Sequence, residues 1–347
     1  MLKSTLNIPE GYSPSLDLRE TEKAIKFTKS NFQDRLAEEL NLARVSAPIL
    51  VLRKTGINDY LTGKERPIRF NVLNMNEEAE IVQALTKWKR VALVDYGFTH
   101  GEGLYTDMNA IRPDETLDNL HSVYVDQWDW ERIVSKDERN LDFLKLIVSK
   151  IYKVIKEMEK LVCEKFEKLQ APFLPEEIYF IHSEDLLEMY PDLSPEKRED
   201  EICREKGAVF VIGVGAELKD GRPHDERAAD YDDWTTETGK GKRGLNGDIL
   251  VWNPLLQCVF ELSSMGIRVD KDSLLEQLEI KGEQENVGLY FHRRLLQEEL
   301  PLTIGGGIGQ SRLCMLYLRK AHIGEVQSSV WPDDMVKKCK ENKIFLL

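Results

Sequence analysis

The sequence lacks three features that mark common specialised classes of protein: long apolar runs, paired cysteines and an excess of positive charge. No stretch approaches the roughly 18 consecutive apolar residues of a membrane-spanning helix, so we expect no membrane partner. The five cysteines are an odd number without a C-x-x-C pair, which argues against a disulfide framework and against a zinc knuckle. Reduced thiols and a cytoplasmic location are expected, because the first residues also show no secretory signal.

The charge balance excludes a further class of partner. The 347 residues include 48 basic and 61 acidic side chains, which gives a formal net charge of −13. Proteins that bind nucleic acid usually carry basic domains or stripes, so we expect no nucleic-acid partner. A pocket with a few well-placed Lys and Arg side chains could still bind a nucleotide or an amino acid.

Two glycine-rich segments fail the test for a dinucleotide-binding motif. Gly213-Val-Gly215 follows an apolar run, but Leu218 occupies the position of the third glycine. The run 305–307 likewise meets Gln310 where that glycine belongs. There is also no Gly-Lys-Ser/Thr phosphate loop, so neither of these common nucleotide sites is present.

The apolar pattern predicts long helices set apart from short strands. Ile25, Phe32, Leu36 and Leu40 recur at helical spacing, which predicts a helix over 21–42. A second helix is predicted over 140–169, and a short one between Ser194-Pro195 and Gly207. Strand-like runs lie at 45–52, 69–73, 91–96, 122–130, 178–182, 209–214, 249–253 and 258–269.

Several of these strands are joined by turns too short for a crossover helix, so antiparallel pairing is expected. Runs of strands with helices gathered elsewhere favour the α+β class, with a mostly antiparallel sheet flanked by helices. We expect one catalytic domain over 21–347, preceded by an N-terminal extension over 1–20.

The segment 219–247 is polar and glycine-rich, with no apolar period. Long irregular loops inside compact domains are uncommon and often functional. A disordered insertion is the alternative interpretation. Tyr231 and Trp234 weigh against it, because disordered polar segments contain few aromatic residues.

A hairpin predicted around a turn at 253–256 sets two carboxylates against each other. In that register Asp248 lies directly opposite Glu261, and alternation places Ser263 on the Glu261 face. Opposed carboxylates repel unless a cation lies between them, and Mg²⁺ prefers such oxygen ligands. The alternative is a different register in which both side chains face solvent.

Two further segments combine polar groups with features of a ligand site. Gln127 and Asp129 continue the apolar stripe of Val123 and Val125 on one strand face, so they point into a cavity or reach water at the strand end. Buried polar groups need partners, and a ligand ammonium would serve. In 304–312, glycines allow close approach of a planar ligand and Arg312 could pair with an anion, although a plain helix start is equally consistent.

Taken in order, these segments resemble the catalytic core of class II aminoacyl-tRNA synthetases. The helix that ends near Pro48 resembles the first motif, Ile111-Arg112-Pro-Asp-Glu115 the second, and 305–312 the third. The segments 121–131, 171–175, 244–254 and 261–268 are similar to ammonia-dependent asparagine synthetases, the aspartate–ammonia ligases. This resemblance extends over roughly 25–331.

The resemblance implies that ATP and L-aspartate, with Mg²⁺, give β-aspartyl-adenylate and pyrophosphate, and that ammonia then releases L-asparagine and AMP. It also implies a homodimer without a tRNA partner. For ATP, it assigns Arg112 to the α-phosphate, Asp248 and Glu261 to Mg²⁺, Arg312 to the adenine or γ-phosphate, and Arg227 and Ser263 to the remaining nucleotide contacts. An aminoacyl-tRNA synthetase paralogue and a non-catalytic nucleotide sensor are the alternatives.

The resemblance also assigns the amino-acid pocket. Lys89, Arg268 and Ser264 would bind the aspartate carboxylates, while Asp59, Gln127 and Asp129 would bind its ammonium group. Asp232 would reach the same pocket from the long loop. One of Asp59, Asp129 and Asp232 would take a proton from ammonium, and the sequence does not choose among them.

Overall fold

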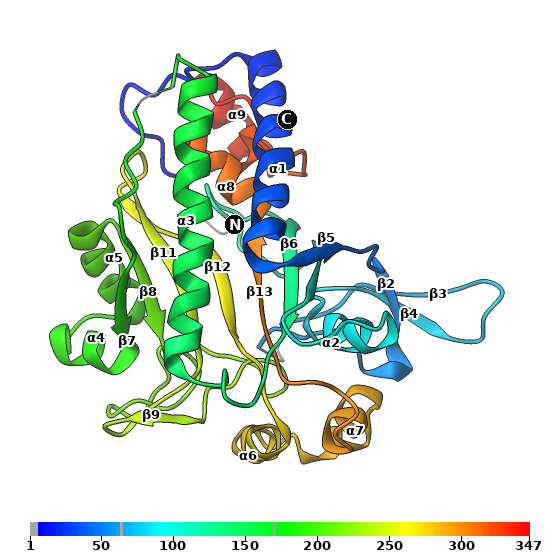
Figure 1. The fold of residues 1–347 in the computed structure, drawn as a ribbon. Coiled ribbons are helices and arrows are strands. Elements are labelled where there is room, and N and C mark those ends of the chain that lie inside the picture. The colour runs from blue at the N-terminus through cyan, green and yellow to red at the C-terminus, as the bar shows by residue number, and fades with distance from the viewer. Residues whose placement is uncertain (1–5, 63–64, 170) are drawn as a thin grey trace.

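The computed structural model describes residues 6–62, 65–169 and 171–347 and is built around an eight-stranded sheet (Figure 1). In order across the sheet, its strands are β1 (Leu42–Arg44), β5 (Gly103–Ile111), β6 (Tyr124–Ile133), β13 (Thr303–Gly309), β12 (Cys258–Ile267), β11 (Asn246–Asn253), β8 (Ala208–Ile212) and β7 (Tyr179–His182). Only the outer pairs, β1–β5 and β8–β7, are parallel. The pairs between them are antiparallel, which confirms the predicted fold class.

Three helices cover one face of the sheet. They are α1 (Leu18–Leu40), α3 (Leu141–Lys165) and α8 (Gln310–Tyr317), and α1 and α3 lie side by side along the strands (Figure 1). Asp17 caps α1 through a capping box, and Asn140 caps α3. Phe32 of α1 stacks on Trp128 of β6 with ring centroids 4.6 Å apart. Both helices predicted from apolar spacing are therefore confirmed, within one to four residues at their ends.

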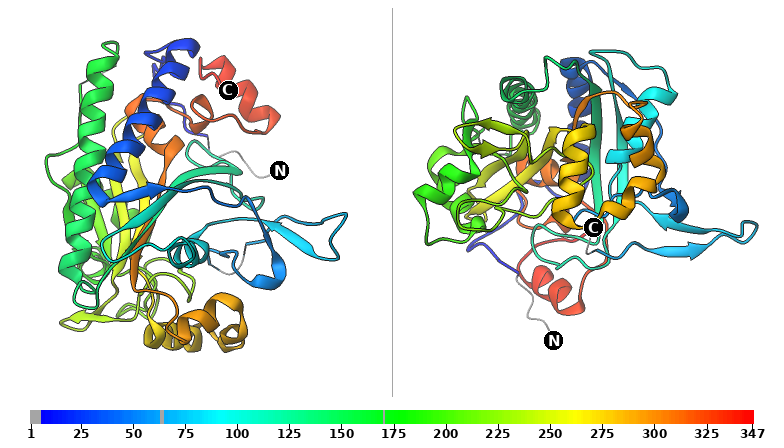
Figure 2. Two further views of the ribbon diagram at one scale, coloured as in Figure 1. Left: turned by 45° about the vertical axis from the view of Figure 1, so that its right-hand side comes forward. Right: turned by 90° about the horizontal axis from the view of Figure 1, so that it is seen from below.

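The remaining elements surround this core. The other helices are α2 (Thr86–Asp95), α4 (Ser183–Met189), α5 (Pro195–Lys206), α6 (Lys271–Lys281), α7 (Tyr290–Leu296) and α9 (Asp333–Glu341), with 3₁₀ turns η1 (Arg53–Thr55), η2 (Gln284–Gly288) and η3 (Ile323–Glu325). Two small sheets contain β2 (Leu50–Leu52), β3 (Arg69–Asn71) and β4 (Glu78–Ile81), and β9 (Glu237–Gly239) and β10 (Lys242–Arg243). The β3–β4 hairpin projects from the body (Figure 2). No helix in the described residues has the length and apolarity needed to cross a bilayer.

One predicted strand is wrong. Residues 91–96 lie in and just after helix α2, because a short apolar run is equally compatible with a buried helix face. The cap-and-stop prediction for α5 is confirmed, with Pro195 at the first turn and Gly207 at the C-cap. The N-terminal segment packs Leu6, Ile8 and Tyr12 against the cluster that contains Met335 of α9. The proposed boundary at residue 20 stays a prediction.

The predicted hairpin register is also wrong, because Asn253 pairs with Cys258 and the turn therefore lies at 254–257, one residue beyond the predicted position. Asp248 lies opposite Ser264, and Glu261 lies opposite Leu250. The register shifts between Ile249 and Leu250, so one extra residue, Leu262, is inserted in β12 as a β-bulge. A bulge of one residue reverses the alternation beyond it, so Ser264 continues the face of Glu261 in place of Ser263.

The long polar segment 219–247 is ordered by contacts with the body. Trp234 is 1% exposed, and its Nε1 donates to the Ala228 carbonyl at 3.0 Å. The Tyr231 hydroxyl donates to the Leu61 carbonyl at 2.9 Å. The segment contains the small β9–β10 hairpin, which sequence analysis missed, and it is not a disordered insertion.

Candidate active site

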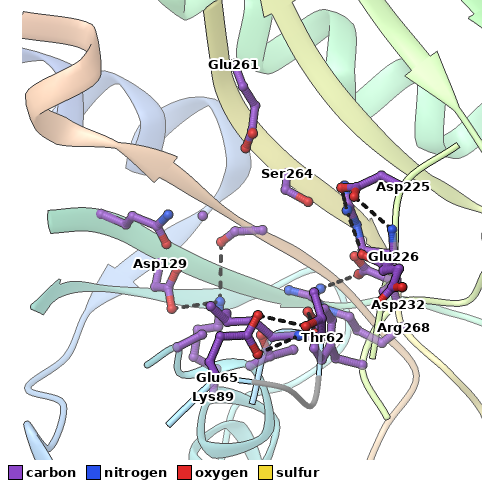
Figure 3. Close-up of a pocket in the computed structure, with 18 of the residues that line it drawn as sticks. Thr62, Glu65, Lys89, Asp129, Asp225, Glu226, Asp232, Glu261, Ser264 and Arg268 are labelled. Atoms are coloured by element: carbon purple, nitrogen blue, oxygen red, sulfur yellow. Dashed lines mark hydrogen bonds and ion pairs between the residues drawn. The ribbon is translucent and has the colours of Figure 1, made fainter. Parts of the chain in front are cut away.

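A cavity of about 250 Å³ lies on the face of the sheet opposite the long helices. Alternation along β6 creates both faces: Trp128 and Trp130 enter the apolar core, while Gln127 and Asp129 line the cavity. In Figure 3 the Asp129 carboxylate points to Lys89, and Glu261 and Ser264 extend from β12 into the same cavity. The prediction that Gln127 and Asp129 point into a cavity is confirmed.

The glycines of β13 make room for these side chains. A Cβ on Gly307 would lie 2.5 Å from Gln127 Oε1 and 2.7 Å from Asp129 Oδ1. A Cβ on Gly305 would lie 2.6 Å from Arg268 Nη2. The glycine run therefore does more than bring backbone close to a ligand, because it opens the space in which neighbouring strands direct polar groups into the cavity.

Helix α2 contributes a cation to the floor of the cavity. Lys89 is 1% exposed, and its Nζ donates to the carbonyl oxygens of Trp130 at 3.1 Å and Gly306 at 3.3 Å. It also lies 3.5 Å from Asp129 Oδ2 (Figure 3). Two carbonyls and one carboxylate thus fix the ammonium group beside the cavity.

Arg268 is the second cation, and two carboxylates hold it in place. Its Nε lies 3.1 Å from Glu131 Oε1 and its Nη2 lies 3.0 Å from Glu131 Oε2, while Nη1 donates to Asp232. Burial alone would raise the pKa of Glu131, but Arg268 and Lys89 hold it below its usual range. Burial raises the pKa of Asp232, and Arg268 offsets this only in part.

Arg112 separates this cavity from an adjoining one of about 210 Å³. It follows directly after β5, and its Nη2 makes one long hydrogen bond of 3.5 Å to the Gln83 carbonyl. Its Nε is buried without a partner. Burial lowers the pKa of Arg112. A buried guanidinium with so few partners is suited to bind an anion at the junction of the two cavities.

Arg312 lies in the first turn of α8 and lines the adjoining cavity. Its Nη1 donates to the Glu261 carbonyl at 2.9 Å and lies 3.7 Å from Glu261 Oε2. Glu261 itself lines both cavities and a third of about 290 Å³. The three hollows therefore meet at this carboxylate.

The two carboxylates predicted to bind a cation do share a cavity. Asp248 and Glu261 both line the third hollow, although the position of the turn and the bulge together offset them along the two strands. Asp248 Oδ1 is buried without a hydrogen-bond partner, and its Oδ2 lies 2.5 Å from Arg227 Nη2. Burial raises the pKa of Asp248 to about 7, Arg227 opposes this rise and Glu261 adds to it.

An unpartnered buried carboxylate oxygen beside a second carboxylate fits an Mg²⁺ ion, which takes one or two protein carboxylates and completes its shell with phosphate and water. The described residues contain no cluster of three or more His, Cys, Asp or Glu side chains arranged for a metal. The donor set is therefore one for a nucleotide-bound metal and not for a fully protein-coordinated one.

Arg227 brings the long loop to the site. It lines the first cavity and pairs with Asp225 as well as with Asp248. Asp232, from the same loop, lines that cavity through its contact with Arg268. Both residues line the first cavity, and their roles toward the nucleotide and the amino acid stay predictions.

Two predicted site residues do not reach the cavities. Asp59 is completely buried behind Thr86, whose backbone N–H donates to Asp59 Oδ2 at 2.5 Å. Its Oδ1 lies 3.9 Å from Lys87 Nζ, and burial raises the pKa of Asp59 to about 6. Ser263 is 1% exposed with an unpartnered hydroxyl, because the bulge turns it away from the cavity.

Sequence reasoning missed the residues that support this site. Glu131, Lys87 and Asp230 are nearly or completely buried charged groups, and Lys87 Nζ lies 2.9 Å from Asp230 Oδ2. Alternation along 123–131 could have found Glu131, which is two residues beyond Asp129 on the same strand face. The pairing of Lys87 with Asp230 spans 143 positions and left no local signal.

The fold defines a class by its architecture: it is similar to the catalytic core of the class II aminoacyl-tRNA synthetases. The crystal structure of asparaginyl-tRNA synthetase from Pyrococcus horikoshii complexed with asparaginyl-adenylate matches with a TM-score of 0.66 at 17% identity, over 94% of this chain and 76% of that one. The aspartyl-tRNA synthetase of Entamoeba histolytica matches with a TM-score of 0.59 at 15% identity, over 90% and 59%. At these identities the likeness shows the fold alone.

The sequence comparisons identify one family among the proteins that share this fold. The model of the aspartate–ammonia ligase family matches residues 19–343. The aspartate–ammonia ligase of Bacteroides thetaiotaomicron is 54% identical over 340 residues, 98% of each chain, and that of Clostridium perfringens is 56% identical over 343 residues, 99% of each. The chain belongs to the aspartate–ammonia ligase family, which confirms the resemblance.

Proposed function

We propose that this protein amidates L-aspartate with ammonia to form L-asparagine, through a β-aspartyl-adenylate formed from ATP. The observation that carries the proposal is the arrangement of three joined hollows. The first contains Lys89 and Arg268, the second is separated from it by Arg112, and the third contains Asp248 and Glu261. A dicarboxylic amino acid requires a cationic site for its carboxylates. A nucleoside triphosphate beside it requires a second cation at the junction and a metal-binding site for its phosphates.

Aspartate binds in the first cavity. Lys89 and Arg268 attract its two carboxylates, and Ser264 offers a hydroxyl beside them. Gln127 and Asp129 receive its ammonium group, since both present oxygens at the same wall. Glu131 and Asp232 hold the Arg268 guanidinium in fixed contacts, so the part of Arg268 that lines the cavity is directed at the ligand.

Activation of the carboxylate takes place at Arg112. A carboxylate is a poor acylating agent, and attack of its oxygen on the α-phosphorus converts it into a mixed anhydride with pyrophosphate as the leaving group. Negative charge grows on the α-phosphate in this step, and a fixed guanidinium stabilises it. Arg112 is suited to this role because it lines both cavities, and because its hydrogen bond to the Gln83 carbonyl is long and leaves the guanidinium available to a phosphate.

Asp248 and Glu261 would hold Mg²⁺ on the phosphates, where the metal would neutralise charge on the leaving group. Arg227 fixes Asp248 at 2.5 Å, and Arg312 fixes Glu261. These two arginines orient the carboxylates and balance their charge. Arg312 also presents a planar cation to the base or the terminal phosphate.

Ammonia attacks the activated carbonyl in the second step, and AMP leaves. The attacking species is NH₃, so ammonium first loses one proton, and the new amide nitrogen loses a second. Of the three carboxylates predicted to accept a proton, Asp129 and Asp232 line the cavity. Asp59 lies behind the wall, so we assign the proton acceptor to one of the other two.

We further propose that the protein is a cytoplasmic homodimer that acts without tRNA. The class II fold supports the dimer through its first motif, which here contains α1 and β1. The acidic net charge of −13 supports the absence of a tRNA partner.

An end-point assay tests the proposed function. Purified protein is incubated with ATP, Mg²⁺, L-aspartate and ammonium, and AMP, pyrophosphate and asparagine are quantified. Equal amounts of all three, with no asparagine when aspartate or ammonium is omitted, are expected. AMP release that requires tRNA would instead identify a synthetase, and the absence of any turnover would favour a nucleotide-sensing role.

A further inference from the structure

The second cavity contains a buried amide whose orientation is fixed by its neighbours. Gln327 follows the 3₁₀ turn η3 and is 5% exposed. Its Nε2 donates to Asp126 Oδ1 at 3.4 Å and to Ser311 Oγ at 3.2 Å. Its Oε1 is buried and has no hydrogen-bond partner among the described residues, although the residue lines the cavity.

The hydrogen-bond network does not permit the reversed amide. Asp126 accepts from Lys29 Nζ at 2.7 Å and from the Ser311 N–H at 3.0 Å, so both of its oxygens act as acceptors. The Ser311 hydroxyl donates its only hydrogen to Asp126 Oδ2 at 2.8 Å, so it can only accept from Gln327. Both neighbours therefore require the NH₂ group of the amide, and neither of them pairs with the carbonyl oxygen.

The backbone around Gln327 is also held in place. His322 caps η3 through a hydrogen bond of 3.0 Å from the Gly324 N–H to His322 Nδ1. The Ile323 N–H donates to the Asn119 carbonyl at 2.8 Å. A fixed acceptor of this kind selects ligands by hydrogen bonding, because a ligand that lacks the matching donor leaves Oε1 unpaired in a buried site.

The rest of the cavity has surfaces that could contact a flat ring. It lies where β13 passes into α8, and its apolar lining comes from Leu120, Val125, Leu262 and Ile323. Arg312 supplies a planar guanidinium that can stack on an aromatic plane. Arg112 lines both this cavity and the cavity of the amino acid. A nucleotide with its phosphate at Arg112 has its base in this second cavity.

We propose that Gln327 selects adenine by accepting a hydrogen bond from its exocyclic 6-amino group. This inference rests on the proposed function and adds the residue that sets its nucleotide specificity. A 6-oxo purine would set its carbonyl oxygen against Gln327 Oε1, and a purine without a 6-substituent would leave Oε1 without a donor. Asp126 and Ser311 are positioning residues for this contact, since they hold the amide and leave the acceptor to the base.

The test compares ATP, ITP and purine riboside triphosphate as substrates of the wild-type protein. We expect kcat/KM for ATP to exceed that for ITP by roughly 10²-fold or more, with purine riboside triphosphate in between. Gln327→Met keeps the length of the side chain and removes the acceptor. It should lower kcat/KM for ATP about tenfold and bring the ATP-to-ITP ratio close to one, while KM for aspartate stays unchanged.

The matched control is Gln310→Met. Gln310 is also a buried glutamine whose Nε2 makes a hydrogen bond, to Asp107 Oδ1 at 3.1 Å, but it does not line the cavity. The control variant should retain the ATP-to-ITP ratio of the wild type. A loss of discrimination in Gln310→Met as large as in Gln327→Met would overturn the assignment, because the effect would then not belong to the contact.

A binding measurement covers the case in which Gln327→Met does not fold. Calorimetric titration of the wild-type protein with AMP and IMP should show clearly tighter binding of AMP, and equal affinities would overturn the proposal. Failure of the inference is distinct from failure of the proposed function. If the wild-type protein makes asparagine equally well from ATP and ITP, only the role of Gln327 in base selection is contradicted. If it makes no asparagine from ATP, the proposed function is contradicted as well.

Discussion

The Glu131 carboxylate and the Arg268 guanidinium meet at two points, with Nε–Oε1 at 3.1 Å and Nη2–Oε2 at 3.0 Å. Both side chains are buried, at 0% and 3% exposure. Gly305 leaves the space for them, because a Cβ there would collide with Glu131 Oε2. Strand β6 thus fixes the cation that β12 presents to the cavity.

Glu131→Gln should weaken both the fold and aspartate binding. The variant leaves the buried Arg268 with one anionic partner, Asp232, so we expect a loss of about 3 kcal/mol in the free energy of unfolding. The hydrogen bonds that orient the guanidinium weaken as well, and KM for aspartate should rise about tenfold or more with a smaller change in kcat. Urea unfolding and steady-state kinetics measure the two effects. Glu138→Gln, which alters a carboxylate that pairs with the exposed His100, is the control.

Arg112→Ala should abolish adenylate formation without unfolding the protein. Within the described part of the chain its guanidinium makes a single hydrogen bond of 3.5 Å, so its removal breaks little internal structure. We expect pyrophosphate release to fall by about 10²–10³, with an unchanged melting temperature. Arg66→Ala, which removes an exposed arginine paired with Asp114, should keep full activity. An active Arg112→Ala protein would contradict the assignment of this residue.

Glu261→Gln should raise the Mg²⁺ concentration needed for half-maximal activity by roughly tenfold or more. The amide keeps the size of the side chain but removes the negative charge that pairs with Asp248 around the metal. Titration of activity against Mg²⁺ at saturating ATP measures the shift. Glu276→Gln, at the exposed pair with Arg243, is the control, and overlapping Mg²⁺ curves for wild type and Glu261→Gln would exclude the carboxylate pair as the metal site.

Gly307→Ala should damage aspartate binding by displacing two side chains at once. The added Cβ would lie 2.5 Å from Gln127 Oε1 and 2.7 Å from Asp129 Oδ1. Because both groups must turn away, kcat/KM for aspartate should fall by up to roughly 10²-fold. Gly288→Ala provides the control, since no atom lies within 4 Å of the added methyl group. Equal kinetics for the two variants would show that β13 does not need this glycine.

Asp59→Asn should change how stability depends on pH. Burial raises the pKa of Asp59 to about 6 in the folded protein, against 3.8 as the ordinary value. The folded state therefore holds this proton more tightly, and its contribution to stability is complete below pH 3.8 and is lost as the pH rises to about 6. The loss amounts to about 3 kcal/mol. Denaturant unfolding between pH 4 and about 7 should show a shallower decline for Asp59→Asn than for wild type.

Asp334→Asn, which changes an exposed carboxylate, should follow the wild-type curve in the same experiment. In Asp59→Asn, the amide oxygen of the new side chain can still accept from the Thr86 N–H, and Lys87 keeps Asp230 as its nearer partner. An identical slope in wild type and Asp59→Asn would show that Asp59 is not the group that titrates.

Local signals in the amino-acid sequence were enough to predict several elements of this protein. Helices α1 and α3 repeat apolar residues at helical spacing over more than 20 residues, and the cap and stop residues delimit α5. The alternation along β6 predicted that Gln127 and Asp129 share one face, and the order of the motifs indicated the family. These features depend on neighbours along the chain, so they can be read without knowledge of the fold.

Features that depend on how distant segments meet became visible only in the folded chain. One inserted residue, Leu262, changed the register of β11 and β12, which moved Ser264 into the cavity and Ser263 out of it. Burial removed Asp59 from the site, although it lies in a matching motif. Glu131 lies 137 positions from Arg268, which it supports. Asp126 lies 201 positions from Gln327, whose amide it holds. Such contacts are set by packing of the whole chain, and no local pattern encodes them.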